Sequence, residues 1–227
     1  MCETDTPSGT VTITAIEPLP SNPNRRRIKV AGRRRVTLAD HEVERLGLEV
    51  GMAWTEELAR RVEASQTAMK IRKAAMARLA RRSYSRGDLA ERLLKKDFPS
   101  ELVDQVLDQL AEDGWLDDEL FARQLAESIL RQKPAGRRLL VQKLVQKRVD
   151  RELAERTARE VLSETDPVED ATALVERRLQ SMSGLSRATR IRRLSGLLAR
   201  RGFDPDTVRS AINALRLQDD DSDAGDP

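Results

Sequence analysis

One short pattern occurs three times in this chain and restricts its fold more than any other feature. Each copy has a leucine, a basic residue, one intervening residue, a large apolar residue, a turn and an apolar-periodic stretch. The copies occupy residues 93–110, 144–162 and 197–215. The large apolar residues Phe98, Val149 and Phe203 follow one another at intervals of roughly 50 residues, a period typical of stacked supersecondary units.

The aligned copies share further columns. Leucine recurs nine and five residues before the large apolar residue, at Leu89, Leu140 and Leu194 and at Leu93, Leu144 and Leu198. A base recurs two residues before it, at Lys96, Lys147 and Arg201. Leucines at helical spacing predict a buried stripe. The basic column has two interpretations, because a cation can complement a helix C-terminus or face a partner.

Each copy belongs to a predicted unit of three helices. The predicted helices are 70–83, 86–97 and 101–113, then 118–132, 136–148 and 151–163, then 168–181, 187–201 and 206–217. Capping signals stand at several starts: Ser85 with Asp88, either Asp117 or Asp118, and Asp204 before a proline. One such unit has a small core, so we expect neighbouring units to share buried faces.

The middle helices of the second and third units are amphipathic and basic. In the second unit, Val141 and Val145 are predicted to share the apolar face with Leu140 and Leu144. In the third unit the arginines are predicted to point away from the core. The residues predicted to bind a partner or DNA are Arg138, Lys143, Lys147, Arg192, Arg193, Arg200 and Arg201.

Positive charge is concentrated in two segments. Residues 131–151 and 176–201 each contain eight basic residues against one acid, in a chain whose net charge is +3. Such clusters attract polyanions or acidic protein surfaces, although a solvated helix face also accounts for exposed bases. The end of the chain is acidic instead, with five aspartates in 219–227, and this tail could occupy the basic faces until it is displaced.

The region before the repeats has a different pattern. The stretches at 11–19 and 25–38 alternate apolar and polar residues around Gly32 and predict a small antiparallel sheet. A short helix closed near Gly47 follows, and 50–54 is a candidate return to the sheet. Thr55 suits the N-cap of a long helix reaching about residue 82, with a break near 65–68.

The predicted fold class is mainly α-helical. Three tandem three-helix repeats form an elongated, curved array, preceded by a small N-terminal module with strands and a helix. The predicted segments are a disordered lead at 1–10, the N-terminal module with the start of the helical region at 11–67, repeats at 68–115, 116–164 and 165–217, and an acidic disordered tail at 218–227. A charged content of 35% against 39% hydrophobic suits thin helical layers.

The sequence offers no catalytic constellation. His41 is the only histidine, Cys2 lies in a polar terminus, and no glycine-rich phosphate loop has the required spacing. We therefore expect a non-enzymatic protein without cofactor or metal. No apolar run has the length of a membrane span, and the N-terminus does not resemble a secretory signal, so we expect a cytoplasmic protein that does not enter the membrane.

Several motifs between about residues 70 and 217 resemble the RecX regulatory proteins of bacterial recombination. They are Ser85-Arg86 with Leu89 and Leu93, Lys96-Asp97-Phe98, Gly114-Trp115-Leu116-Asp117-Asp118, Phe121-Ala122, Gly136 before a leucine-rich helix ending in "QKRV", and "LARRGFDPDTVRSAI". Their order and spacing carry the resemblance. Two positions depart from it, because Asp97 and Arg148 stand where glycine is common; they must adopt a positive φ or close their helices differently.

The resemblance implies a function in homologous recombination, DNA repair and the SOS response. RecX proteins have three tandem three-helix repeats and bind the RecA recombinase, in the groove of its nucleoprotein filament. There they modulate, usually inhibit, filament growth, ATP hydrolysis and strand exchange. Members also bind DNA, so the expected partners are the RecA filament and single- and double-stranded DNA, with the protein expected to be a monomer.

Two other interpretations stay open. The chain could be a helical-repeat protein that binds DNA directly through its basic faces, without RecA. Aromatic residues for base stacking are few, and Trp54, Trp115, Tyr84 and the phenylalanines are mostly predicted in the core. A scaffold for another acidic protein is the third interpretation.

Overall fold

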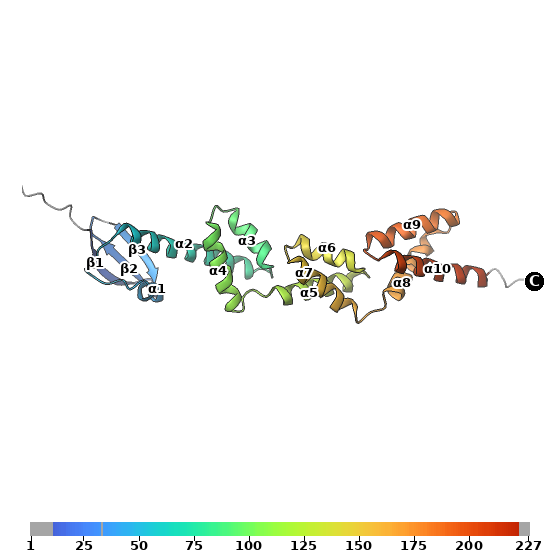
Figure 1. The fold of residues 1–227 in the computed structure, drawn as a ribbon, viewed down its shortest axis with the longest axis horizontal. Helices are drawn as coiled ribbons and strands as arrows, with labels where there is room; N and C mark the ends of the chain where they lie inside the picture. Colours follow the sequence, from blue (N-terminus) through green and yellow to red (C-terminus); the bar gives the residue numbers. More distant parts are fainter. Residues whose placement is uncertain (1–10, 33, 223–227) are drawn as a thin grey trace, which may run out of the picture. The chain divides into compact units, whose positions relative to one another are not determined.

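The structure, a computed structural model, describes residues 11–32 and 34–222. These residues form two compact units, one with residues up to 78 and 93–109, the other with 79–92 and residues from 110 onwards. Helices predominate and a small sheet lies near the N-terminal end, as predicted (Figure 1). The elongated, curved arrangement of the repeats stays a prediction. The predicted disordered lead at 1–10 and the last five residues of the predicted tail lie outside the described residues.

The N-terminal sheet has three antiparallel strands in the order β1-β2-β3. They are β1 (Ile13–Leu19), β2 (Asn22–Val30) and β3 (Arg34–Ala39). Ile28 of β2 lies opposite Ile16 on one side and Val36 on the other, and its side chain is completely buried. Gly32, at φ 84°, lies in the turn between β2 and β3, where a residue with a Cβ would be strained.

Two helices complete the core of this module. They are α1 (Asp40–Arg45) and α2 (Glu56–Leu79), and Leu58 and Val62 of α2 join the apolar core of the sheet. Thr55 caps α2 as predicted, since its Oγ1 accepts a hydrogen bond of 3.1 Å from the Leu58 N–H. The predicted return to the sheet is confirmed only in part: residues 50–54 form no strand, but Ala53 makes an isolated antiparallel bridge with Thr12, and the Trp54 N–H donates to the Val11 carbonyl at 2.7 Å.

The predicted break at 65–68 is wrong, because α2 is continuous from Glu56 to Leu79. Two polar residues at this place make contacts with the N-terminal module. Ser65 Oγ donates to Glu42 Oε2 at 2.6 Å, and Gln66 Nε2 donates to the Thr37 carbonyl at 3.3 Å. Tertiary hydrogen bonds therefore offset the low helix propensity of this stretch. The predicted boundary between residues 67 and 68 falls inside one helix.

The remaining helices follow the predicted order of the three repeats. They are α3 (Arg86–Leu94), α4 (Ser100–Glu112), α5 (Asp118–Gln132), α6 (Arg137–Gln146), α7 (Arg151–Leu162), α8 (Pro167–Leu179) with a 3-10 turn η1 (Gln180–Met182), α9 (Arg187–Arg200) and α10 (Pro205–Ser222). Since α10 extends to Ser222, residues 218–222 are helical where disorder was predicted. Neither glycine nor proline interrupts the helix between 206 and 222.

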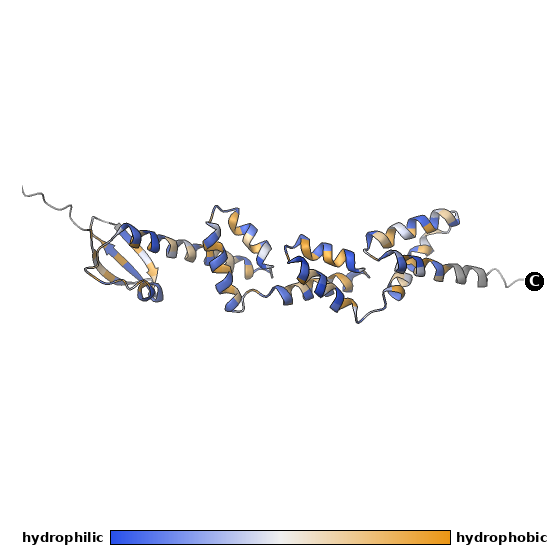
Figure 2. Ribbon diagram, in the orientation of Figure 1, coloured by the Kyte–Doolittle hydropathy of each residue, from blue (hydrophilic) through white to orange (hydrophobic). Residues whose placement is uncertain are grey.

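The repeated leucines form the cores, as predicted. All six leucines of the two columns are at most 1% exposed: Leu89, Leu93, Leu140, Leu144, Leu194 and Leu198. In the second repeat Leu144 packs with Ala122 of α5 and Ala154 of α7, and in the third Leu198 packs with Phe203 and Ala211. Hydrophobic residues alternate with hydrophilic ones along these helices (Figure 2), because each helix buries one stripe.

The thrice-repeated pattern is a helix C-cap. Asp97, Arg148 and Gly202, the residues between the base and the large apolar residue, have φ of 59°, 60° and 83°. In the second repeat the Val149 N–H donates to the Leu144 carbonyl at 3.2 Å, and Phe203 and Leu198 are joined in the same way in the third. This is the Schellman arrangement, in which a left-handed residue ends the helix and the next residue packs back on it. The positive φ expected as one possibility is confirmed.

The predicted N-caps are also confirmed. Asp117 Oδ1 accepts from the Leu120 N–H at 2.8 Å, and Asp204 accepts from the backbone N–H groups of Asp206 and Thr207 at 3.0 and 2.9 Å. Asp118 has a different role, because its Oδ1 accepts a 2.7 Å hydrogen bond from the Arg86 N–H at the start of α3. Burial raises the pKa of the Asp118 carboxyl, and this hydrogen bond partly opposes the rise.

Candidate partner-binding surfaces

A joint connects the second and third repeats, where the start of α6 meets the end of α9. The Gly136 N–H donates to the Arg201 carbonyl at 2.9 Å, and the Arg138 N–H donates to the Gly202 carbonyl at 3.2 Å. The Arg201 guanidinium extends back to α5, where it donates to the carbonyls of Lys133 and Pro134 at 2.6 and 2.8 Å. Burial lowers the pKa of this guanidinium.

The Arg201 side chain thus complements carbonyl groups at the end of α5, which is one of the two interpretations of the basic column. Cations at such sites stabilise the unsatisfied carbonyls of a helix C-terminus. The residue is half-buried rather than free on the surface. Its role in binding a partner stays a prediction.

The joint between the first and second repeats uses the same positions. Ser85, in register with Gly136, donates its hydroxyl hydrogen to the carbonyl of Lys147, which is in register with Arg201. A Cβ at Gly87 would lie within 3.0 Å of the Arg148 carbonyl oxygen, so the two backbones are in close contact there. Arg148 also pairs with Glu91 of α3 at 3.0 Å. The repeats are therefore connected twice by the same kind of contact.

The exposed side of α9 carries the arginines that the sequence singled out. Arg192, Arg193 and Arg200 are exposed and lie on the side opposite the buried Leu194 and Leu198; we call these three residues the α9 arginine face. The helix contains no acidic residue. Within the described part of the third repeat the one ion pair is Arg209 with Asp206 at 3.1 Å, so the α9 arginine face is not neutralised locally.

In the second repeat, by contrast, several arginines form ion pairs. Arg156 pairs with Glu119 at 2.6 Å, Arg123 pairs with Glu160 at 3.2 Å, and Arg137 pairs with Glu155. These exposed pairs contribute little stability, but they reduce the net positive field of the repeat.

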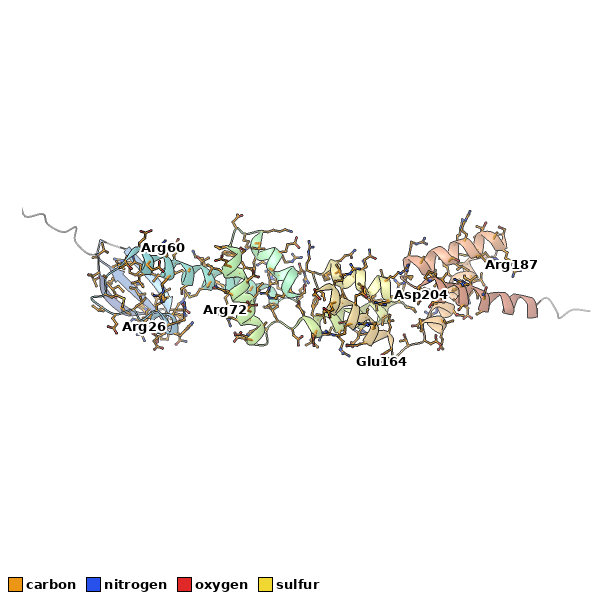
Figure 3. The ribbon with its side chains drawn as sticks, in the orientation of Figure 1. Arg26, Arg60, Arg72, Glu164, Arg187 and Asp204 are labelled. Atoms are coloured by element: carbon orange, nitrogen blue, oxygen red, sulfur yellow. The ribbon has the colours of Figure 1, made fainter. Side chains whose placement is uncertain are left out.

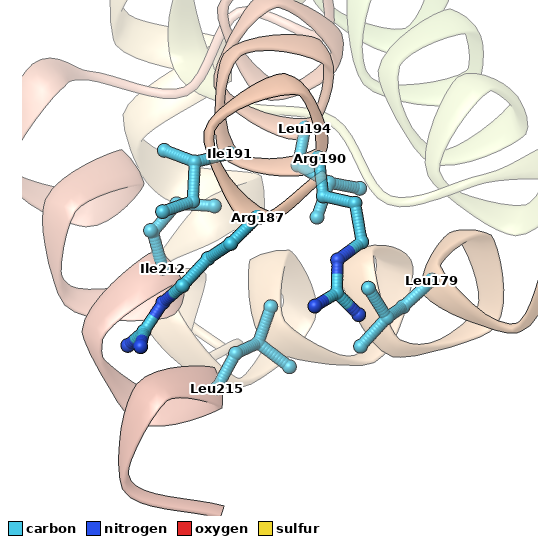
Figure 4. Close-up of a pocket in the computed structure, with 7 residues that line it drawn as sticks. All are labelled: Leu179, Arg187, Arg190, Ile191, Leu194, Ile212 and Leu215. Carbon is cyan, nitrogen blue, oxygen red and sulfur yellow. The ribbon is translucent and has the colours of Figure 1, made fainter. Parts of the chain in front are cut away.

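Two more arginines stand at the start of α9, beside the apolar core of the third repeat. Figure 4 shows the side chains of Arg187 and Arg190 with Ile191, Ile212 and Leu215, which line the same small cavity. The cavity between these side chains has a volume of about 20 Å³. A water molecule needs roughly this space, so the cavity is too small for an organic ligand. Figure 3 labels Arg187 near one end of α9 and Asp204 near the other, among the side chains of the third repeat.

A larger hollow lies on α6 and the start of α7, which we call the α6 groove. Its volume is about 940 Å³, and it is lined by Arg138, Val141, Gln142, Val145, Arg148 and Arg151 among others. Val145 is 36% exposed, so its predicted place on the buried face is wrong. Leu140 and Leu144 fill the core instead, and the valines lie beside them toward the groove. Of the predicted binding residues, Arg138 lines it.

Lys143 and Lys147 are exposed but do not join Arg138. Five residues along a helix correspond to a rotation of about 140°, which separates Lys143 from Arg138. Lys143 Nζ donates to Gln146 Oε1 at 3.4 Å, a contact within α6. The predicted binding residues therefore fall into four places: the α9 arginine face, the α6 groove, the opposite side of α6, and the joint at Arg201.

Trp115 is a surface residue that the sequence placed in the core. It is 55% exposed and, with Leu120 at 51%, borders a hollow of about 170 Å³ that also contacts Tyr84 and Phe121. The reason is a turn at Gly114, whose φ is 76°, after which Leu116 rather than Trp115 is buried. The Arg82 guanidinium lies over the ring of Tyr84, 3.7 Å from the ring centroid.

Features of other site classes are missing from the residues that the structure describes. None of the described histidine, cysteine, aspartate and glutamate side chains form a group of three or more that could hold a metal ion. His41 has a side chain that is 77% exposed and lies 3.6 Å from Glu42. Among the described helices, none combines the length and apolarity needed to cross a membrane.

The fold and these surfaces define a helical-repeat protein with tandem three-helix domains and two distinct arginine-bearing surfaces. The first, second and third three-helix domains of RecX match residues 72–110, 117–157 and 164–212 of this chain, in that order. The chain belongs to the RecX family.

Relatives and solved structures agree with this assignment. The regulatory protein RecX of Pelodictyon phaeoclathratiforme is 36% identical over 145 residues, covering 64% of this chain and 88% of the relative. That of Thermobifida fusca is 38% identical over 128 residues, or 55% and 67% of the two chains. A crystal structure of regulatory protein RecX has the same fold, with a TM-score of 0.75 and 18% identity over 89% of this chain and 99% of that one. RecX from Lactobacillus salivarius has a TM-score of 0.59 and 19% identity over 67% and 98%.

Proposed function

We propose that this RecX-family protein is a non-enzymatic regulator of homologous recombination and DNA repair. It binds the RecA nucleoprotein filament and inhibits its ATPase, its growth and strand exchange. The observation that carries the proposal is the tandem series of three RecX domains, whose third member presents the α9 arginine face, for which the described residues supply no carboxylate partner. With DNA and a DNA-bound recombinase as partners, it acts in the cytoplasm, and a single chain is sufficient for binding.

The partner chemistry supports a composite target. A nucleoprotein filament offers phosphate groups and acidic protein surface, and arginine forms paired hydrogen bonds with phosphates and carboxylates alike. Repeats that each contact the filament weakly bind it tightly together, because the first contact raises the effective concentration of the next. A protein bound across several RecA protomers obstructs the rearrangements that accompany ATP hydrolysis, or blocks the addition of further protomers.

The experiment measures RecA ATPase activity on single-stranded DNA with purified protein added. Wild type is expected to lower the steady-state rate, and the variant R192E/R193E/R200E to lose most of that effect with unchanged circular dichroism. The matched control is R61E/K70E/K73E, which makes the same change in net charge at exposed positions of α2. No inhibition by wild type, or equal inhibition by both variants, would contradict the proposal.

Direct binding to DNA without RecA is the second candidate function, and the α9 arginine face is the observation that favours it. An arginine surface that neutralises several phosphates gives an affinity that falls steeply with salt concentration. Binding to bare single-stranded, bare double-stranded and RecA-coated DNA, compared at moderate salt, separates the two functions. A strong preference for the coated form supports the regulator, and equal affinities support the DNA-binding protein.

A further inference from the structure

The α6 groove combines two kinds of surface that are separated elsewhere on the described residues of this repeat. Val141 and Val145 lie one helical turn apart and form an aliphatic strip along the groove. Arg138 and Arg151 lie at the groove as well, one from the start of α6 and one from the start of α7. Any ligand of this groove meets an apolar strip and guanidinium groups at once.

The fold does not need the outward valine for its core. Leu140 and Leu144 of the same helix are fully buried, whereas Val145 is 36% exposed. Most large apolar residues of the second repeat are covered better than this, so an apolar side chain at position 145 is available to a partner. A polar residue there would leave the packing of the repeat intact.

The charges of the groove are partly committed and partly free. Arg137 pairs with Glu155, and Arg148 pairs with Glu91 at 3.0 Å. Among the described residues, Arg138 and Arg151 have no carboxylate partner, so both guanidinium groups can bind carboxylates from outside. The other carboxylate at the groove, Asp204, accepts hydrogen bonds from the backbone at the start of α10, so the two guanidinium groups leave the groove complementary to negative charge.

A nucleic acid would complement only the charged part of the α6 groove and not its apolar strip. A phosphate backbone would pair with the arginines but would leave the two valines against a polar, hydrated chain. A protein segment with carboxylates beside aliphatic side chains satisfies both, since burying apolar surface on the valines is favourable. The volume of about 940 Å³ is at the upper end of ordinary ligand pockets and admits several side chains.

We infer that the α6 groove binds an acidic, amphipathic protein segment, with its apolar side chains on Val141 and Val145 and its carboxylates on Arg138 and Arg151. The α9 arginine face, which has bases but no comparable aliphatic strip, is then the separate surface for phosphate. The part of this inference that names RecA as the source of the segment rests on the function proposed above. The chemistry of the groove itself does not.

The test uses two synthetic acidic peptides of equal length and charge, titrated into the full-length protein. One has leucines at helical spacing and the other has serines in their place. Wild type is expected to bind the leucine peptide about tenfold more tightly than the serine peptide. V145D is expected to abolish this preference, and R151E to weaken binding of both peptides. The matched control V50D introduces the same change at a valine that is 63% exposed in the other unit, and it should behave like wild type.

A second set of titrations compares a labelled oligothymidine with RecA-coated single-stranded DNA. V145D should lose about tenfold in affinity for the coated DNA and change little on the bare oligonucleotide. The inference is overturned if wild type binds the two peptides equally or binds neither. Where wild type does bind the coated DNA, the inference is also overturned if V145D weakens binding to the bare oligonucleotide as much as to the coated DNA, or if V145D binds the coated DNA as tightly as wild type. If wild type does not bind the coated DNA but still prefers the leucine peptide, the groove inference holds and the proposed function fails.

Discussion

The backbone N–H of Gly136 donates a hydrogen bond of 2.9 Å to the carbonyl oxygen of Arg201, and this bond holds the start of α6 in the second repeat against the end of α9 in the third. A Cβ at position 136 would overlap the backbone of residues 202 and 203, so the contact requires glycine. The α6 groove begins beside this joint, because Gly202 and Asp204 contribute to its wall. The joint therefore positions a candidate binding surface as well as two helices.

Gly136→Val should weaken the joint. Inserting a side chain into a close backbone contact typically costs about 1–3 kcal/mol of unfolding free energy. Denaturant unfolding followed by circular dichroism measures the change. Gly184→Ala is the matched control, because a Cβ at Gly184 would meet nothing within 4 Å. Equal midpoints for the two variants would show that the contact does not restrain the repeats.

Asp97→Gly should stabilise the protein. Asp97 is a non-glycine residue at φ 59°, and the left-handed conformation costs an L-residue about 1–2 kcal/mol, a cost that glycine avoids. We expect a gain of roughly 0.5–1 kcal/mol in the free energy of unfolding, after the larger backbone entropy of glycine is subtracted. Gly202→Ala is expected to do the opposite, because φ there is 83° and a Cβ would overlap Leu139. A loss of stability in Asp97→Gly would contradict the C-cap interpretation.

The cap at Asp204 should make stability depend on pH. The hydrogen bond from the Thr207 hydroxyl, together with backbone N–H donors, lowers the pKa of the Asp204 carboxyl below its unfolded value. A lowered carboxyl pKa stabilises the fold above the unfolded pKa, and this contribution is lost as the pH falls through the folded pKa. Asp204→Asn keeps an accepting oxygen but cannot titrate.

We therefore expect wild type to be more stable than Asp204→Asn near neutral pH, with the difference disappearing in acid. Urea unfolding of both proteins across that range measures it. A difference that stays constant at all pH values would mean that the carboxylate charge contributes nothing to the cap.

Arg201→Ala separates the two interpretations of the basic column. Losing the hydrogen bonds to the carbonyls of Lys133 and Pro134 should lower the unfolding free energy by about 1–2 kcal/mol. Arg200→Ala, which changes an exposed neighbour, should leave stability within about 0.5 kcal/mol. If Arg201→Ala keeps the stability of wild type but loses affinity for RecA-coated DNA, Arg201 is a contact residue and not a joint residue.

Much of the fold is encoded locally and could be predicted. The base, spacer and apolar residue mark a C-cap, and the columns of Leu140 and Leu144 mark a buried stripe; both signals depend on residues within one or two turns. The N-caps at Thr55, Asp117 and Asp204 are local in the same sense. Such features need no knowledge of neighbouring helices.

The features that could not be predicted from the sequence depend on contacts between residues that are far apart in the chain. The continuity of α2 rests on Ser65 meeting Glu42, and the exposure of Val145 depends on where α7 and the third repeat lie. Trp115 is exposed because the turn at Gly114 directs Leu116 into the core instead. The candidate site was predicted as one set of cations, but the structure divides it by the helix face on which each residue lies.

The most direct measurement for the central claim is the affinity of the full-length protein for RecA-coated single-stranded DNA relative to the same DNA without RecA, at one moderate salt concentration. The account predicts at least about a tenfold preference for the coated DNA, with the affinity for the coated DNA reduced by R192E/R193E/R200E and unaffected by R61E/K70E/K73E. Equal affinity for coated and bare DNA would contradict it and would leave direct DNA binding as the function.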